Sequence, residues 1–179
     1  MTQTAQTYGE SLYELAREEH LGEEILSQLQ MVSRLWQENP QYIRLLSSPT
    51  VPKQERCAVL DESFRGQVHP YLLNFMKILA ENGTVSQLPG CEEAYLRRYN
   101  EENCILEVTT VTARPRSGAL QEKLRARLEA YTGKTIVLRT RVDAAILGGI
   151  RMEMAGRRLD GSVRNRLEDL QATLQSMVL

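Results

Sequence analysis

Apolar residues recur at helical spacing through the first hundred positions of the chain. Residues 7–20 and 23–38 place apolar side chains three or four positions apart on one helix face (Tyr8, Leu12, Leu15 and Ala16; Ile25, Leu29, Val32 and Trp36). Shorter helices are expected over residues 42–46 and 52–64. Another is expected after residues 88–90, with Ala94, Tyr95 and Tyr99 spaced for burial. Helices joined by such short loops form a compact antiparallel bundle.

The most informative segment of this half is residues 69–81. Its apolar side chains cover nearly the whole circumference of a helix (Tyr71, Leu72, Leu73, Phe75, Met76, Ile78 and Leu79). Such a helix is either enclosed at the centre of the bundle or in contact with a partner, and the sequence leaves both alternatives open. The helix at residues 5–20 is its expected neighbour, with Gly9 and Ser11 small enough for another helix to lie close. Two such helices form a groove of the kind that receives a third, amphipathic helix.

The pattern changes between Asn103 and Ile105. A strand rich in β-branched residues is followed by a helix at 117–133, whose apolar stripe is Leu120, Leu124, Leu128 and Tyr131. Two alternating segments then predict strands over 134–143 and within 148–160, with Ala155-Gly156 as a hairpin turn. Ser162 is expected to cap a last helix with apolar positions at Val163, Leu167, Leu170, Leu174 and Met177.

The order of elements predicts an α+β chain of two domains. Residues 1–104 would form an antiparallel helical bundle, and residues 105–179 a small α/β domain with a mixed sheet and a C-terminal helix. Charge divides at the same place. The first part has 9 basic and 15 acidic residues, a net charge of −6, and the second has 13 basic and 8 acidic residues, a net charge of +5. This asymmetry indicates either different partners for the two domains or two solvated surfaces that attract each other.

Membrane insertion and secretion are not indicated. Hydrophobic residues make up 42% of the chain and charged residues 25%, which is typical of a globular protein in water. The first twenty residues lack the apolar core of a signal peptide. The longest run of apolar residues and glycine, at 144–150, is far too short for a membrane span.

The sequence offers no catalytic, cofactor or metal site. The cysteines are odd in number and widely spaced, and only His20 and His69 are available as further ligands, which disfavours a disulfide framework and a zinc site. The segment Gly133-Lys134-Thr135 resembles the end of a phosphate-binding loop, but Leu128 occupies the position of the first glycine. It also leads from a helix into a strand, the reverse of that motif. We therefore expect no enzyme activity.

Nucleic-acid binding through the basic second half is the alternative function. Arginines that could contact phosphates are frequent there (Arg114, Arg116, Arg125, Arg127, Arg139, Arg141, Arg157 and Arg158). They fall on several elements, acidic residues lie among them, and Tyr131 is the only aromatic residue on which a base could stack. These features favour a protein-binding chain, with a nucleic-acid adaptor as the second hypothesis.

Three stretches resemble the delta subunit family of rotary F-type ATP synthases, whose mitochondrial counterpart is the oligomycin-sensitivity-conferring protein. AQTYGESLYELA resembles the family's first helix, in which alanine is usual at the positions of Gly9 and Ser11 and proline at that of Thr7. LLNFMKILAENGTVSQLP resembles its fifth helix and the following turn. DAAILGGIRMEMAGRRLDGSVRNRLEDL resembles its C-terminal signature, and the match runs from about residue 4 to the end of the chain.

The resemblance implies a non-catalytic stator subunit with a six-helix N-terminal bundle. It implies that the N-terminal helix of an alpha subunit docks between the first and fifth helices, against Tyr8, Ser11, Leu12, Leu15, Asn74, Phe75 and Ile78. The C-terminal domain would receive the ends of the b subunits of the peripheral stalk. The complex would lie at the cytoplasmic face of a bacterial plasma membrane, with this subunit peripheral and without a cofactor, a metal or nucleic acid.

The C-terminal signature implies a shaped interface domain. Its residues here are Gly148, Gly149, Asp160, Gly161, Ser162, Val163 and Arg164. The glycine pair would let a strand bend or a neighbour approach closely. Asp160, Gly161 and Ser162 are expected to turn the chain into the last helix.

Overall fold

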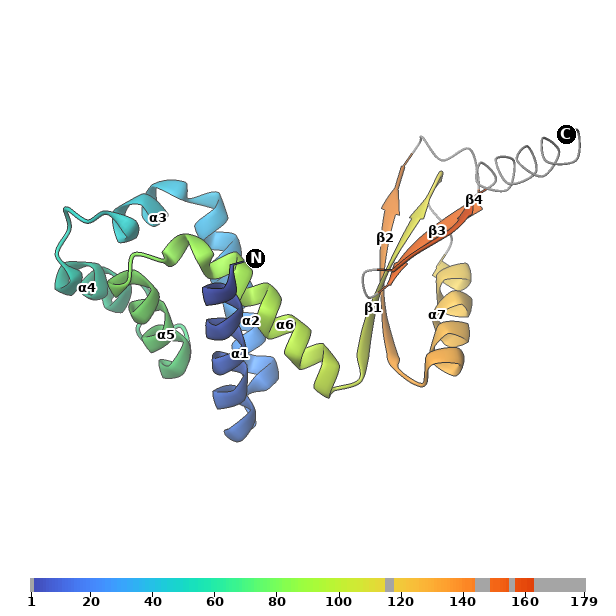
Figure 1. The fold of residues 1–179 in the computed structure, drawn as a ribbon, viewed down its shortest axis with the longest axis horizontal. Helices are drawn as coiled ribbons and strands as arrows, with labels where there is room; N and C mark the ends of the chain where they lie inside the picture. The colour runs from blue at the N-terminus through green and yellow to red at the C-terminus, as the bar shows by residue number, and fades with distance from the viewer. Residues whose placement is uncertain (1, 115–117, 144–148, 155–156, 163–179) are drawn as a thin grey trace, which may run out of the picture. The chain divides into compact units, whose positions relative to one another are not determined.

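The chain divides into two compact units, Met1–Tyr99 and Asn100–Leu179, in a computed structural model (Figure 1). The structure describes residues 2–114, 118–143 and 149–154, and the backbone of 157–162. Helices make up the first unit and a small sheet with one described helix makes up the second, so the α+β class is confirmed.

The first unit contains the helices that the apolar spacing predicts. They are α1 (Gln3–Glu18), α2 (Gly22–Glu38), α3 (Pro40–Ser47), α4 (Lys53–Phe64), α5 (Pro70–Glu81), the short 3-10 helix η1 (Val85–Gln87) and α6 (Leu88–Glu102). Two of the boundaries that differ from the expectation have a local cause. α1 begins earlier because the Thr2 hydroxyl accepts a hydrogen bond from the Ala5 N–H at 3.3 Å and so caps the helix. α6 includes Pro89 and Gly90 in its first turn. The backbone N–H groups of a first turn have no partner within the helix, so a proline there costs no hydrogen bond.

Gly9 brings α1 unusually close to α6. A β carbon at Gly9 would stand 2.3 Å from the Cys91 carbonyl oxygen and 2.8 Å from the β carbon of Ala94. Gly9 itself is buried. The sequence had suggested that Gly9 brings a helix close beside residues 69–81, but the helix that it admits is α6. Gly9 therefore serves the packing of α1 against α6 within the bundle.

Buried Arg56 ties α4 to the ends of two other helices. Its Nη1 atom donates to the carbonyl oxygen of Leu46, at 3.2 Å, and to that of Ala80, in the last turns of α3 and α5. A cation is favourable at a helix C-terminus because the unpaired carbonyls and the helix dipole attract it. Lys77 and Asp61 form a second link between α5 and α4 at 2.8 Å. These contacts fix the position of α5.

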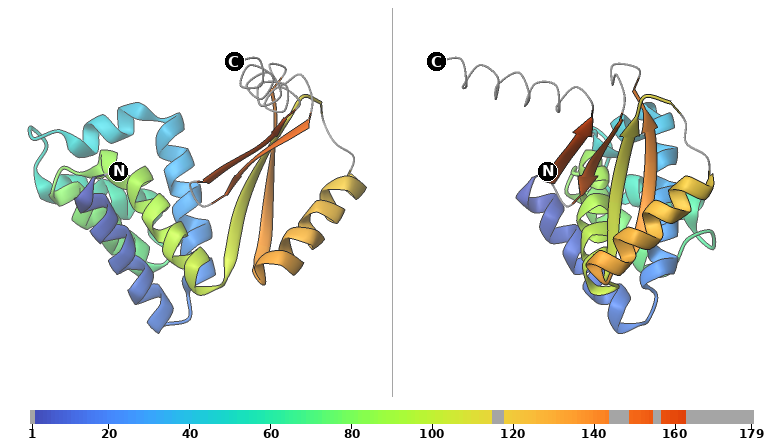
Figure 2. Two further views of the ribbon diagram at one scale, coloured as in Figure 1. Left: turned by 45° about the vertical axis from the view of Figure 1, so that its right-hand side comes forward. Right: turned by 90° about the vertical axis from the view of Figure 1, so that its right-hand side faces the viewer.

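The second unit is a mixed sheet with one described helix. Its elements are β1 (Ile105–Thr112), α7 (Gly118–Thr132), β2 (Thr135–Val142), β3 (Gly149–Met154) and β4 (Arg157–Ser162), in the sheet order β2-β1-β3-β4. β1 and β2 are parallel, and the chain crosses between them through α7, which lies along the β2 side of the sheet (Figure 2). β1 pairs antiparallel with β3, and β3 with β4, so the sheet is mixed as expected.

The strand pairing corrects part of the structure that was predicted for the C-terminal signature. Gly149 begins β3 with φ +90°, a conformation that residues with a β carbon rarely adopt. The expected turn at 160–162 is wrong: Asp160, Gly161 and Ser162 pair with Arg151, Ile150 and Gly149 as the end of β4. The six-residue β3 offers backbone partners up to Ser162, and this ladder extends the strand through the polar Asp-Gly pair. Gly148, Val163, Arg164 and the helix expected after Ser162 lie outside the described residues.

The apolar stripe of α7 is less buried than its spacing predicted. Leu124 and Leu128 are half-buried, whereas Leu120 is 45% exposed and Tyr131 89% exposed. The middle of the stripe is thus the part that is shielded from solvent, and the two ends remain accessible.

Candidate partner-binding groove

An apolar groove runs between α1 and α5. It has a volume of about 400 Å³ and is lined by Thr7, Tyr8, Ser11, Leu12 and Leu15 of α1 and by Tyr71, Asn74, Phe75 and Ile78 of α5. All seven residues that the family resemblance placed in a groove are among these nine. The structure therefore brings the candidate site residues together on one surface.

The groove has a buried floor and exposed apolar walls. Leu12 and Phe75 are only 4% and 7% exposed, while Leu15 and Ile78, one on each helix, are 38% and 46% exposed. A single exposed leucine is ordinary, but apolar side chains that converge on a concave surface mark a binding site. The exposure of Ile78 also excludes full enclosure of residues 69–81, because the bundle does not cover α5 on this side.

Tyr8 holds the two walls in a fixed relation. Its ring makes an edge-to-face contact with Phe75, with centroids 6.4 Å apart and planes at 85°. Its hydroxyl accepts a hydrogen bond from the Asn82 side-chain amide at 3.3 Å, just beyond the end of α5. With α5 itself held by Arg56, the groove is formed before any partner arrives, which lowers the entropy cost of docking.

Two lining residues, Thr7 and Tyr71, were not among those expected from the sequence. Thr7 precedes Ser11 by one helical turn, and Tyr71 stands in the same relation to Asn74 and Phe75. The family resemblance pointed to the other seven residues, and helical spacing along the same two faces would have added these two. The resemblance marks Thr7 only as a departure from proline, and the spacing marks Tyr71 only as part of the apolar circumference of residues 69–81.

No charged side chain is among the groove's lining residues. The polar groups there are hydroxyls and one amide. The Thr7 hydroxyl donates to the Gln3 carbonyl of its own helix at 3.0 Å. By contrast, the Ser11 hydroxyl and the Asn74 amide are exposed and hydrogen-bond to no described residue. An occupant must therefore be mainly apolar where it faces the groove.

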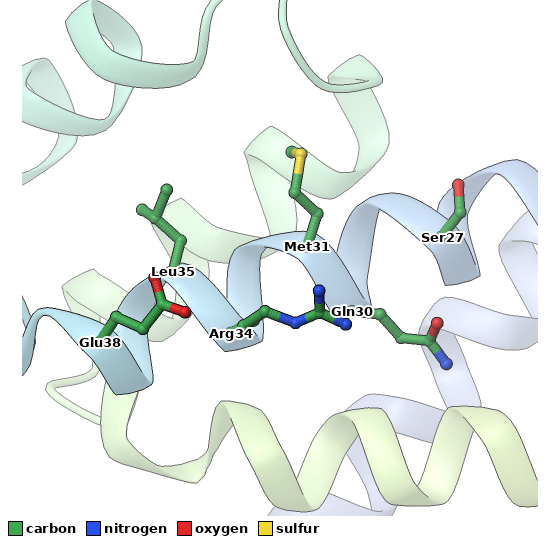
Figure 3. Close-up of a pocket in the computed structure, with 6 residues that line it drawn as sticks. All are labelled: Ser27, Gln30, Met31, Arg34, Leu35 and Glu38. Atoms are coloured by element: carbon green, nitrogen blue, oxygen red, sulfur yellow. The ribbon is translucent and has the colours of Figure 1, made fainter.

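A second recess lies on α2 alone, as Figure 3 shows. It measures about 350 Å³ and is lined by Ser27, Gln30, Met31, Arg34, Leu35 and Glu38. Met31 and Leu35 are 46% and 43% exposed, with an arginine and a glutamate beside them. One helix face with mixed charges lacks the second wall that a helix-binding groove needs. Met31 is as exposed as Ile78 but lies outside the α1/α5 groove.

The described residues offer little for chemistry. Among them, no three His, Cys, Asp or Glu side chains are placed to hold a metal ion, and no helix is long and apolar enough to cross a membrane. Burial raises the pKa of the Cys91 thiol to about 11, so it stays a weak nucleophile near neutral pH. Lys134 is exposed and lies between the end of α7 and the start of β2.

The basic residues of the second unit are partly neutralised by acidic neighbours. Arg139 pairs with Glu107 at 3.0 Å, and Arg125 pairs with Glu122 at 2.8 Å. Such pairing reduces the positive potential that contacts to a phosphate backbone require. The nucleic-acid hypothesis gains no support from this surface.

Comparison with known proteins identifies consistent relatives along nearly the whole chain. Residues 4–174 match the family described as ATP synthase delta (OSCP) subunit. ATP synthase subunit delta of Rubrobacter xylanophilus is 34% identical over 173 residues, covering 94% of each chain. The same subunit of Clostridioides difficile is 26% identical over 175 residues, covering 97% of each.

Solved structures support the fold. A chain in the cryo-EM structure of the Toxoplasma gondii mitochondrial ATP synthase hexamer superimposes with a TM-score of 0.74, covering 98% of each chain at 21% sequence identity. A chain of this assembly thus shares the fold.

Proposed function

Because the chain belongs to the ATP synthase delta (OSCP) family, we propose that it ties the catalytic head of an F-type ATP synthase to the b subunits of the stalk. Subunits of this family are components of the peripheral stalk, and their role is structural and not catalytic. A stator resists torque without performing chemistry, so its contacts need large apolar area and slow dissociation.

The α1/α5 groove is the proposed site for the N-terminal helix of an alpha subunit. The observation that carries this proposal is the pair of exposed apolar walls, Leu15 and Ile78, above a floor formed by Leu12 and Phe75. An amphipathic helix covers such a groove with side chains at i, i+3, i+4 and i+7. Burial of apolar surface contributes about 25 cal/mol per Å² before ordering costs are subtracted. In this proposal α1 to α6 act as one antiparallel bundle that presents the groove.

Residues 105–179 are proposed to receive the C-terminal ends of the b subunits. The described part of this domain includes exposed apolar side chains that its own fold leaves accessible, among them Leu120 and Val142, at 45% and 49% exposure. Its net charge of +5 contrasts with −6 for residues 1–104, which favours different partners for the two domains. The bacterial relatives support a place at the cytoplasmic face of the plasma membrane.

Binding by the separate domain tests this division of labour. A fragment of residues 1–104 is expected to fold as a helical bundle, since α6 ends at Glu102 and the first strand begins at Ile105. It should bind the alpha N-terminal segment with nearly the affinity of the full chain and should not bind the b subunits. Circular dichroism checks the fold, and titration with each partner measures affinity. If the fragment binds b as well as the full chain does, the stalk site lies within residues 1–104 and the proposed assignment to residues 105–179 is wrong.

A further inference from the structure

Two polar side chains interrupt the apolar surface of the groove, one on each wall. Ser11 lies between Tyr8 and Leu15 along α1, and Asn74 lies between Tyr71 and Ile78 along α5. Both are exposed, and neither hydrogen-bonds to any residue that the structure describes. Thr7, on the same wall as Ser11, differs because its hydroxyl already donates a hydrogen bond to the Gln3 carbonyl oxygen. The unpaired donors and acceptors are thus in the middle of the groove.

Docking of a helix changes the surroundings of these groups. In the free protein, water satisfies the Ser11 hydroxyl and the Asn74 amide. A helix that fills the groove displaces this water, and each group that then lacks a partner weakens binding by roughly tenfold. An occupant with an uninterrupted apolar stripe would leave both unpaired. The groove therefore discriminates between helices that are equally amphipathic.

We propose that the occupant of the groove is an amphipathic helix whose apolar stripe contains a hydrogen-bonding, uncharged residue opposite Ser11 and Asn74. This inference rests on the proposed function of the groove and adds the chemistry by which the correct helix is recognised. A neutral amide or hydroxyl satisfies both groups, because an asparagine amide and a serine hydroxyl each donate and accept. A polar residue at one buried position also fixes register, as a single asparagine does in a coiled coil.

Paired substitutions on the two sides of the interface test the proposal. The first probe is the N-terminal segment of the alpha subunit from the same ATP synthase. The second is the same segment with each uncharged polar residue in its apolar stripe replaced by leucine. The full-length chain is used as wild type and as the double variant Ser11→Ala with Asn74→Leu, which removes both polar groups and keeps the number of side-chain heavy atoms at Asn74. Gln30→Leu on α2 is the control for a polar-to-leucine change on a helix outside the groove.

The expected result is a change of preference. Relative to the control, the double variant should shift the ratio of the two affinities by about tenfold or more in favour of the leucine segment. Comparing ratios cancels the greater hydrophobicity of that segment. An unchanged ratio would overturn the inference, and so would a native segment with no polar residue in its stripe that binds the wild type tightly.

Ile78→Glu separates failure of this inference from failure of the groove itself. If Ile78→Glu abolishes binding of both segments while the ratio is unchanged by the double variant, the groove is the site and only the polar recognition is wrong. If Ile78→Glu leaves both affinities unchanged, the groove is not the site and both proposals fail. Fluorescence of Trp36 and circular dichroism establish that each variant is folded.

Discussion

Substitution of Gly9 by alanine tests the packing of the wall that α1 contributes to the groove. Considered as a helix residue alone, alanine would stabilise α1 by about 1 kcal/mol relative to glycine. The structure predicts the opposite sign, because the new β carbon would stand 2.3 Å from the Cys91 carbonyl oxygen and 2.8 Å from the β carbon of Ala94. Neither obstacle is the movable end of a side chain, so α1 and α6 would have to separate.

The magnitude follows from these two opposing effects. Normal contacts between heavy atoms begin near ~3.5 Å, so relief requires a separation of about 1 Å between the two helices. Overpacking of a core costs about 1–3 kcal/mol, and a clash with backbone lies in the upper part of that range. After the propensity gain is subtracted, we expect Gly9→Ala to lower the free energy of unfolding by about 1–2 kcal/mol.

Urea unfolding followed by tryptophan fluorescence measures this change. Trp36 is the only tryptophan of the chain and is 1% exposed in the first unit, so its emission reports the unfolding of that unit. Gly22→Ala is the matched control, since its β carbon would meet the Tyr99 ring at an ordinary 3.6 Å. The control should be neutral or stabilising by up to about 1 kcal/mol. If Gly9→Ala is as stable as the parent or more so, the close approach of α1 to α6 is wrong.

Two further predictions concern the bundle. Arg56→Met should lower the free energy of unfolding by about 1–3 kcal/mol, because the carbonyls of Leu46 and Ala80 lose their buried donor; urea titration measures it, and unchanged stability would mean that the arginine does not hold α5. The raised pKa of Cys91 predicts that the protein loses stability at alkaline pH, because the folded state keeps a proton that the unfolded thiol releases near pH 9.0. The contribution of this thiol to the free energy of unfolding is full below pH 9.0 and is lost as pH rises toward about 11. Unfolding at a series of alkaline pH values, compared with Cys91→Ala, measures it; an equal slope in both proteins would show that the thiol is not responsible.

The sequence could predict the groove because its residues follow local rules. Helical spacing alone puts Ser11 and Leu15 on one face of α1 and Asn74 and Ile78 on one face of α5. Spacing shows which residues share a face, although it does not show what that face contacts. The exposure of Ile78 depends on how α5 sits in the bundle, which only the tertiary structure supplies.

Features that depend on distant partners could not be predicted. The contact of Gly9 with Cys91 joins α1 to α6, and no local pattern marks which helix a glycine faces. The strand residues Asp160 and Gly161 have the composition of a turn, yet pairing with β3 determines their conformation. In both cases tertiary contacts decide the structure against the local preference.

The most direct test of the central claim is a titration of the full-length chain with the alpha N-terminal segment, comparing Ile78→Glu with Met31→Glu. Both side chains are 46% exposed in the free protein, so the two substitutions differ mainly in whether the glutamate lies in the groove. A carboxylate desolvated without a partner costs several kcal/mol. We therefore expect Ile78→Glu to weaken binding by at least about a hundredfold, and Met31→Glu to bind as the wild type does. Equal affinity of a folded Ile78→Glu variant and the wild type would contradict the assignment of the alpha site to the α1/α5 groove.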